Sequence, residues 1–112
     1  MDPVMEYWRV EWHHDFGGEP VLFFHEIGPD RWETRRVQGY QDGRLLRADA
    51  GHEAGDVLLA EVPFGDIADV AAQEEFSARV IDRHEFEAVW RRARWPASGS
   101  GGHPAGGQRP AV

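Results

Sequence analysis

The chain of 112 residues contains no cysteine and no lysine. The absence of cysteine excludes disulfides, thiolate metal ligands and cysteine nucleophiles. The absence of lysine means that all twelve basic residues are arginine. Codon bias in a GC-rich genome is the simplest explanation, and the alternative is that arginine suits bidentate pairing with carboxylates at an interface.

The chain also has no apolar run near the roughly 20 residues that a membrane-spanning helix needs. It begins MDPVMEYWRV, which is acidic and aromatic, whereas an export signal places a cationic stretch before an apolar one. We therefore expect a soluble, cytoplasmic protein that does not enter a membrane. Secretion by a route without a classical signal stays open.

Positive charge is scarce in the first two thirds of the chain. Residues 1–76 hold 17 Asp and Glu against 6 Arg, a balance of −11, whereas residues 77–112 hold 3 against 6, a balance of +3. Binding to a phosphate backbone needs a cationic footprint. The net charge of −8 thus argues against nucleic acid as a partner and favours a protein with a basic surface.

Aromatic residues are plentiful, with five Trp, six Phe and two Tyr, and they supply large apolar side chains for a core. The end of the chain is different. The sequence PASGSGGHPAGGQRPAV is rich in Gly, Pro and Ser and cannot bury enough apolar surface to offset its ordering entropy. We expect one compact domain over residues 1–95 and a disordered tail over residues 96–112.

Three stretches have the composition of β-strands. Residues 7–13 alternate between apolar and polar side chains, as a half-buried strand does. Residues 21–27, VLFFHEI, are apolar on both faces at their start and suit a central strand. Residues 57–64, VLLAEVPF, are either a short fifth strand or an extended connection, and Pro63 restricts them to the edge or the end of a sheet.

Asp42-Gly43 lies between two further β-like runs and predicts a hairpin with a two-residue type I′ loop. This loop pairs Tyr40 with Leu45, and Arg36 with Asp49. It places a polar set on one face of the hairpin, which comprises Thr34, Arg36, Gln38, Tyr40, Arg47 and Asp49.

Two helices are expected in the second half of the chain. The first is short, with Asp66 as its N-cap and an end near Phe76. In the second, Asp82 as N-cap and Glu85 three residues later resemble a capping box. Its apolar stripe consists of Phe86, Val89, Trp90 and Ala93. Together these patterns predict an α+β fold, with an antiparallel sheet of four to five strands and two C-terminal helices packed on one face.

His13, His14 and Asp15 are adjacent and raise the question of a metal site. Neighbouring side chains on a strand point to opposite faces, so two adjacent histidines cannot bind one ion unless the strand has already turned. No spaced ligand set such as His-Glu-x-x-His occurs. We interpret the three residues as a strand end and expect no metal and no cofactor. Other possible ligands are His25, Glu26, His52 and Glu53.

His25 lies in an otherwise apolar strand, where burial would shift its pKa and could make it a general acid or base. The simpler interpretation is a sheet histidine bonded to a backbone carbonyl or a glutamate. No serine has a Gly-x-Ser-x-Gly context, and no glycine-rich stretch precedes a lysine as a phosphate loop requires.

Four segments, EYWRVEWHHDF, RWETRRVQGYQDGRL, ADAGHEAGD and DRHEFEAVWRRA, together resemble a family of small actinobacterial domains of unknown function. Members open with a YWRVEWxHDF-like strand and end in an EFExxW helix. The resemblance covers about residues 5–94 and implies one compact domain in a bacterial cytoplasm. It transfers no catalytic residues. It also implies likeness to the small acidic proteins that actinobacteria often encode near polymorphic toxins.

These observations lead to two hypotheses on function. The first is a noncatalytic, immunity-like protein-binding module with an acidic surface for a basic partner, and its binding residues would be Arg36, Gln38, Tyr40, Arg47 and Asp49. The second is a small cofactor-independent acid-base enzyme, such as an isomerase or cyclase, with a pocket on the sheet. Its catalytic residues would be His25, Tyr7, Tyr40 and Arg36. The sequence does not indicate an oligomeric state.

Overall fold

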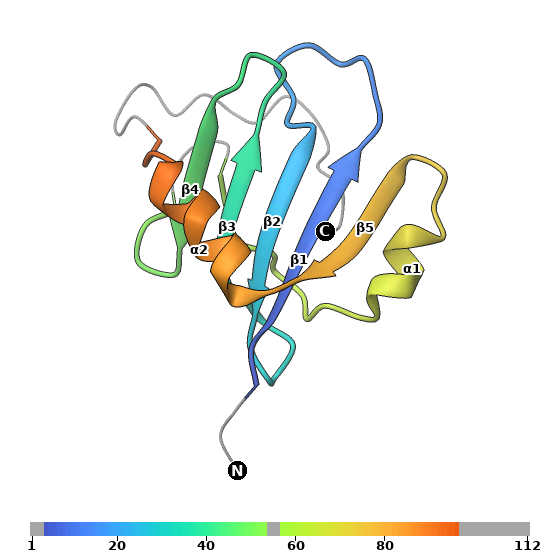
Figure 1. The fold of residues 1–112 in the computed structure, drawn as a ribbon, viewed down its shortest axis with the longest axis vertical. Coiled ribbons are helices and arrows are strands. Elements are labelled where there is room, and N and C mark those ends of the chain that lie inside the picture. Colours follow the sequence, from blue (N-terminus) through green and yellow to red (C-terminus); the bar gives the residue numbers. More distant parts are fainter. Residues whose placement is uncertain (1–3, 54–56, 97–112) are drawn as a thin grey trace.

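The computed structural model describes residues 4–53 and 57–96, so the predicted tail over residues 96–112 lies outside the described residues except for Pro96. The described residues form an α+β fold with one five-stranded antiparallel sheet and two helices (Figure 1). The elements in chain order are β1 (Glu6–Trp12), β2 (Leu22–Ile27), β3 (Glu33–Gly39), β4 (Leu45–Asp49), α1 (Ile67–Ala71), β5 (Phe76–Ile81) and α2 (Arg83–Arg92).

The strand order is β4-β3-β2-β1-β5, and every neighbouring pair is antiparallel. β1 ends at Trp12, directly before His13, which confirms the strand end predicted there. The fifth strand is β5, which the sequence patterns did not predict. Neither helix in the described part of the chain has the length and apolarity needed to cross a bilayer.

Residues 57–65, which we call the strap, form an extended connection and not a fifth strand. Val57 is a single β-bridge residue, and two backbone N–H groups further along the strap bond to a side chain and to a loop. The Ala60 N–H donates to the Glu33 carboxylate at 2.8 Å, and the Phe64 N–H donates to the Arg31 carbonyl at 2.7 Å. Pro63 lacks the N–H that a continuous ladder would require.

The hairpin between β3 and β4 turns at Asp42-Gly43, as predicted, but its loop has three residues instead of two. The Tyr40 N–H donates to the Arg44 carbonyl at 3.0 Å, so these two residues close the loop. Gly43 has a φ of 92°. A three-residue loop whose last residue is left-handed is a common alternative to the two-residue type I′ loop.

The longer loop shifts the register of the hairpin by one residue, and the predicted register is therefore wrong. Arg36 lies opposite Ala48, and Asp49 lies opposite Arg35. A shift of one residue moves every side chain of a strand to the other face of the sheet. Arg36 and Asp49 consequently lie on opposite faces.

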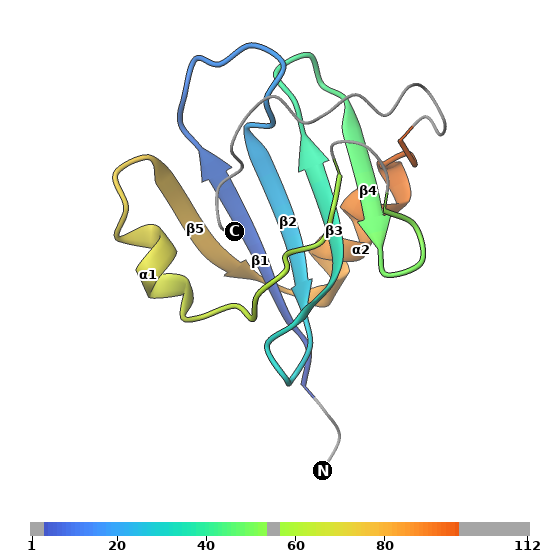
Figure 2. The ribbon, with the colours of Figure 1, turned by 180° about the vertical axis from the view of Figure 1, so that it is seen from behind.

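The two helices pack on opposite faces of the sheet, which corrects the prediction that both cover one face. Val70 of α1 belongs to a cluster with Trp8, and Phe86 of α2 belongs to a cluster with Tyr7. Tyr7 and Trp8 are neighbours on β1, so their side chains point to opposite faces. Only α2 is C-terminal, because α1 precedes the last strand, β5. Figure 2 shows the strap crossing the face of the sheet that α2 leaves uncovered, and we call this face the strap face and the other the α2 face.

α2 begins where the capping pattern predicted it. The Asp82 carboxylate accepts a hydrogen bond from the Glu85 N–H at 2.8 Å and so satisfies one of the free donors of the first turn. Phe86 is 0% exposed beneath the helix, and Trp90 is half-buried. This helix therefore covers the α2 face by apolar packing.

Candidate functional site

A chain of hydrogen-bonded polar side chains lies on the strap face, where the sheet would be expected to be apolar. His25 Nδ1 lies 2.5 Å from Glu33 Oε2, and Arg36 donates to both Glu33 oxygens at 2.9 to 3.2 Å. Arg36 also donates to Gln38, whose amide nitrogen donates to the Tyr40 hydroxyl at 3.1 Å. Each of the five side chains is at most 8% exposed. We call this set the buried polar chain.

The strap closes over the buried polar chain. Glu33 receives the Ala60 N–H, and the Phe64 ring lies 5.0 Å from the His25 ring. The Arg31 guanidinium holds the end of the strap through the carbonyls of Phe64 and Gly65, at 3.2 and 2.7 Å. Polar side chains from β2, β3 and the turn between them thus position a segment that has no regular structure.

Burial and neighbouring charges have opposite effects on the pKa values of His25 and Glu33 in the buried polar chain. Burial lowers the pKa of His25 below 6.5 and outweighs the opposing effect of the Glu33 carboxylate. Burial alone would raise the pKa of Glu33, but Arg36 and His25 outweigh it, so that pKa lies below 4.5. The geometry therefore favours an ionised Glu33 bound to Arg36, beside a neutral His25.

The His25 ring is fully buried, which bears on the acid-base hypothesis. The ring stacks on Phe23 at 5.8 Å and meets Trp8 and Phe64 edge-on. Nε2 has no hydrogen-bond partner among the described residues. Because the side chain is 0% exposed, a substrate would reach it only if the strap moved away from the sheet.

The structure does not bring the four predicted catalytic residues together. His25, Arg36 and Tyr40 belong to the buried polar chain on the strap face, whereas Tyr7 lies on the α2 face against Phe86, at a ring separation of 5.2 Å. Burial, with a contribution from the nearby charge of Glu26, raises the pKa of Tyr7.

The predicted binding residues are likewise divided between the two faces. Arg36, Gln38 and Tyr40 are buried on the strap face. Arg47 is on the α2 face, where its guanidinium lies 4.9 and 4.5 Å from the rings of Trp90 and Trp95. Asp49 accepts a hydrogen bond from His52. These residues therefore do not form one surface, because the register differs from the predicted one.

The histidines near the end of β1 have protein partners. His13 Nε2 lies 2.7 Å from the Ser77 hydroxyl, and His14 Nε2 lies 2.8 Å from the Pro20 carbonyl. Within residues 4–53 and 57–96, no group of three or more His, Cys, Asp or Glu side chains is arranged to hold a metal ion.

An acidic surface surrounds α1, at the β5 edge of the sheet (Figure 1). Five exposed carboxylates lie on α1 and the segments that flank it, and the stretch from residue 48 to residue 78 contains no arginine. None of the five forms an ion pair within the part of the chain that the structure describes. We call this set the acidic surface, and its members are Glu61, Asp66, Asp69, Glu74 and Glu75.

The sequence reasoning missed the acidic surface because it weighed charge over residues 1–76 as a whole. Many carboxylates in that range are neutralised in the fold. Glu26 and Glu33, for example, are paired with Arg35 and Arg36. The signal was present in the local sequence EVPFGDIADVAAQEE, which has five acidic residues and no basic one.

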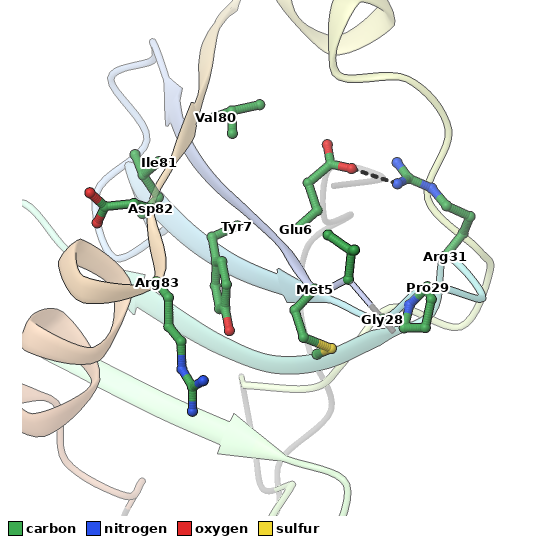
Figure 3. A pocket seen from close by; sticks show the side chains of 11 residues that line it. Met5, Glu6, Tyr7, Gly28, Pro29, Arg31, Val80, Ile81, Asp82 and Arg83 are labelled. Atoms are coloured by element: carbon green, nitrogen blue, oxygen red, sulfur yellow. Dashed lines mark hydrogen bonds and ion pairs between the residues drawn. The ribbon is translucent and has the colours of Figure 1, made fainter. Parts of the chain in front are cut away.

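A notch opens beside the start of β1, where β5 turns away into α2 (Figure 3). Its volume is about 970 Å³, and much of its wall is apolar. Three of its charged groups have partners: Arg31 pairs with Glu6 at 2.7 Å, and the Asp82 carboxylate caps α2. The fourth, Arg83, is exposed and lies 3.8 Å from Glu87. Arg83 is therefore the charged group of the notch that is held most loosely, and one such group does not specify a ligand.

The chain matches the family model described as a domain of unknown function (DUF6881) over residues 6–95, and it belongs to this family. The match spans the sheet, both helices and the strap. Searches of curated proteins and of solved structures found no match.

Proposed function

We propose that this member of the family is a noncatalytic protein-binding module, with an immunity-like role in a bacterial cytoplasm, that presents its acidic surface to a basic protein. The observation that carries the proposal is the set of five exposed carboxylates around α1 without ion-pair partners among the described residues. A structural role in the fold would pair such groups with arginines, as β3 pairs Glu26 with Arg35.

Electrostatic reasoning supports a binding role for this surface. Like charges close together repel each other, so the acidic surface destabilises the isolated domain slightly. The same field accelerates encounter with a cationic partner and selects against acidic ones. A partner with an arginine- or lysine-rich patch therefore fits this surface.

The test is a pull-down from a lysate of the source organism with immobilised full-length chain, performed at low and high salt. The variant Asp69→Asn/Glu74→Gln removes two charges from the acidic surface. Glu19→Gln/Asp42→Asn removes one charge from the β1–β2 loop and one from the β3–β4 loop and is the matched control. We expect a basic protein that the wild type and the control retain, that the first variant loses, and that salt releases.

Two results would contradict the proposal. One is that no protein is retained at low salt. The other is that both double variants lose the retained protein equally, because the effect would then follow net charge and not the acidic surface.

A further inference from the structure

We propose that a cleft at the opposite edge of the sheet binds small organic phosphates. The cleft has a volume of about 410 Å³ and is formed by the start of β4 and the residues that follow α2. We call it the arginine cleft, and it is lined by Gly43, Arg44, Leu45, Leu46, Arg92, Arg94 and Trp95. The inference does not depend on the proposed function, because β4 and β5 are the two edges of the sheet.

Positive charge is concentrated in the arginine cleft, although the chain as a whole carries −8. Arg92 and Arg94 are exposed, and their guanidinium groups have no carboxylate or hydrogen-bond partner within the part of the chain that the structure describes. Arg44 is paired with Asp42 at 2.8 Å, but both side chains are more than half exposed. Guanidinium groups bind phosphate oxygens through two parallel hydrogen bonds, which favours a phosphoryl group as the ligand.

A backbone donor adds to these charges. The Leu45 carbonyl accepts from the Arg94 N–H at 2.9 Å, so the backbone groups of Leu45 point away from β3 toward the residues after α2. The N–H and the carbonyl of one strand residue point to the same side of the strand. The Leu45 N–H therefore faces the outer edge, and it has no acceptor among the described residues.

The remaining wall of the arginine cleft is apolar and ordered. Trp95 is 40% exposed, and its ring is held by the Arg47 guanidinium at 4.5 Å and by Trp90 edge-on at 5.7 Å. Leu45 and Leu46 complete the wall. Small-molecule pockets commonly span roughly 300 to 1,000 Å³, so the cleft has room for an organic group beside the phosphate. A phosphate monoester with a flat ring combines these features.

The experiment is isothermal titration calorimetry of the full-length chain with phenyl phosphate, with inorganic phosphate and with phenol. We expect saturable binding of phenyl phosphate with a Kd of about 1 mM or below, weaker binding of phosphate, and none of phenol. Arg92→Gln/Arg94→Gln should weaken binding about ten-fold or more, since two charge-assisted contacts are lost. Arg83→Gln/Arg91→Gln removes two exposed charges from α2 outside the cleft, and it should leave the Kd within about two-fold of wild type.

Three results would overturn the inference. Phenyl phosphate that does not bind saturably excludes a phosphate site. Equal weakening in the two double variants shows a general charge effect. A third result comes from sedimentation velocity at low salt: if Arg92→Gln/Arg94→Gln abolishes self-association and phenyl phosphate does not compete with it, the cleft binds a second copy of the chain instead of a small molecule.

Discussion

The two faces of this sheet are covered by different means. On the α2 face a capped, amphipathic helix lays Phe86 over Tyr7 and Phe24, and a partly exposed ion pair between Glu87 and Arg35 adds to this apolar contact. On the strap face an irregular segment is held by a buried carboxylate, Glu33, and by Arg31. The comparison teaches that a segment without regular structure can cover a sheet when buried polar side chains supply its backbone with partners.

The largest difference should appear when one arginine-bound carboxylate is removed from each face. Glu33→Gln removes the fully buried negative charge that binds Arg36, His25 and the Ala60 N–H, so we expect the free energy of unfolding to fall by about 3 to 5 kcal/mol. Glu87→Gln on the α2 face breaks a partly exposed pair with Arg35 and should cost less than about 1 kcal/mol. Urea denaturation at pH 7 measures both. Equal losses in the two variants would remove the distinction between the coverings.

The strap face should also respond to pH. The pKa of His25 is lowered in the folded state, so the unfolded chain takes up the proton first. The stability contributed by neutral His25 is therefore complete above pH 6.5 and is lost as the pH falls from 6.5 through the folded pKa. The loss for this one group is at most about 1.4 kcal/mol per pH unit. Glu33, whose pKa is lowered below 4.5, adds a second loss at lower pH.

His25→Gln tests this assignment because it keeps a donor for Glu33 and does not titrate. Urea midpoints of this variant, measured between about pH 5 and 7, should vary less with pH than those of the wild type. The decrease below pH 4.5 should remain. An unchanged slope between about pH 5 and 7 would mean that His25 does not control this range.

A smaller effect should separate the two helices. Asp82→Ala removes the side chain that accepts the Glu85 N–H, and we expect a loss of about 1 kcal/mol in stability. Asp66 has the same position in α1 but accepts no capping hydrogen bond, so Asp66→Ala should change stability by less than about 0.5 kcal/mol. Thermal unfolding of the two variants side by side tests this. A comparable loss from Asp66→Ala would show that α1 depends on its cap as α2 does.

The smallest effect is expected on the acidic surface. Asp69→Asn/Glu74→Gln touches no hydrogen bond or ion pair of a side chain within the described residues, so stability should change by less than about 0.5 kcal/mol. A slight gain would fit the relief of repulsion among neighbouring carboxylates. Circular dichroism melts at low salt measure it. A large loss would mean that these carboxylates support the fold and are not free for a partner.

Much of the fold could be predicted from local patterns. The alternation in residues 7–13 located β1, and Asp82 with Glu85 located the start of α2. β5 escaped prediction because its side chains do not alternate regularly between buried and exposed. Only its two ends, Phe76 and Ile81, are buried in the core. For residues 57–64 the sequence left a strand and an extended connection open, and the structure has the connection, whose apolar residues cover the sheet.

The candidate site was less predictable than the fold. The sequence suggested a polar surface with Arg36 and Asp49 on one face, and a one-residue difference in the loop separated them. The simpler interpretation of His25, a sheet histidine bonded to a glutamate, describes its contact with Glu33. That Glu33 would be this partner required the pairing of β2 with β3, since the two residues are eight positions apart.

The sequence by itself determined that β1 to β4 extend, that the chain turns at Asp42-Gly43 and where α2 begins, because strand alternation, turn chemistry and helix capping depend on residues within a few positions of each other. Only the tertiary structure decided the register of β3 and β4, the opposite placement of the two helices and the burial of the polar chain under the strap. These features depend on loop closure and on contacts between distant segments, so one additional loop residue at Asp42-Gly43 was enough to reassign side chains between the two faces.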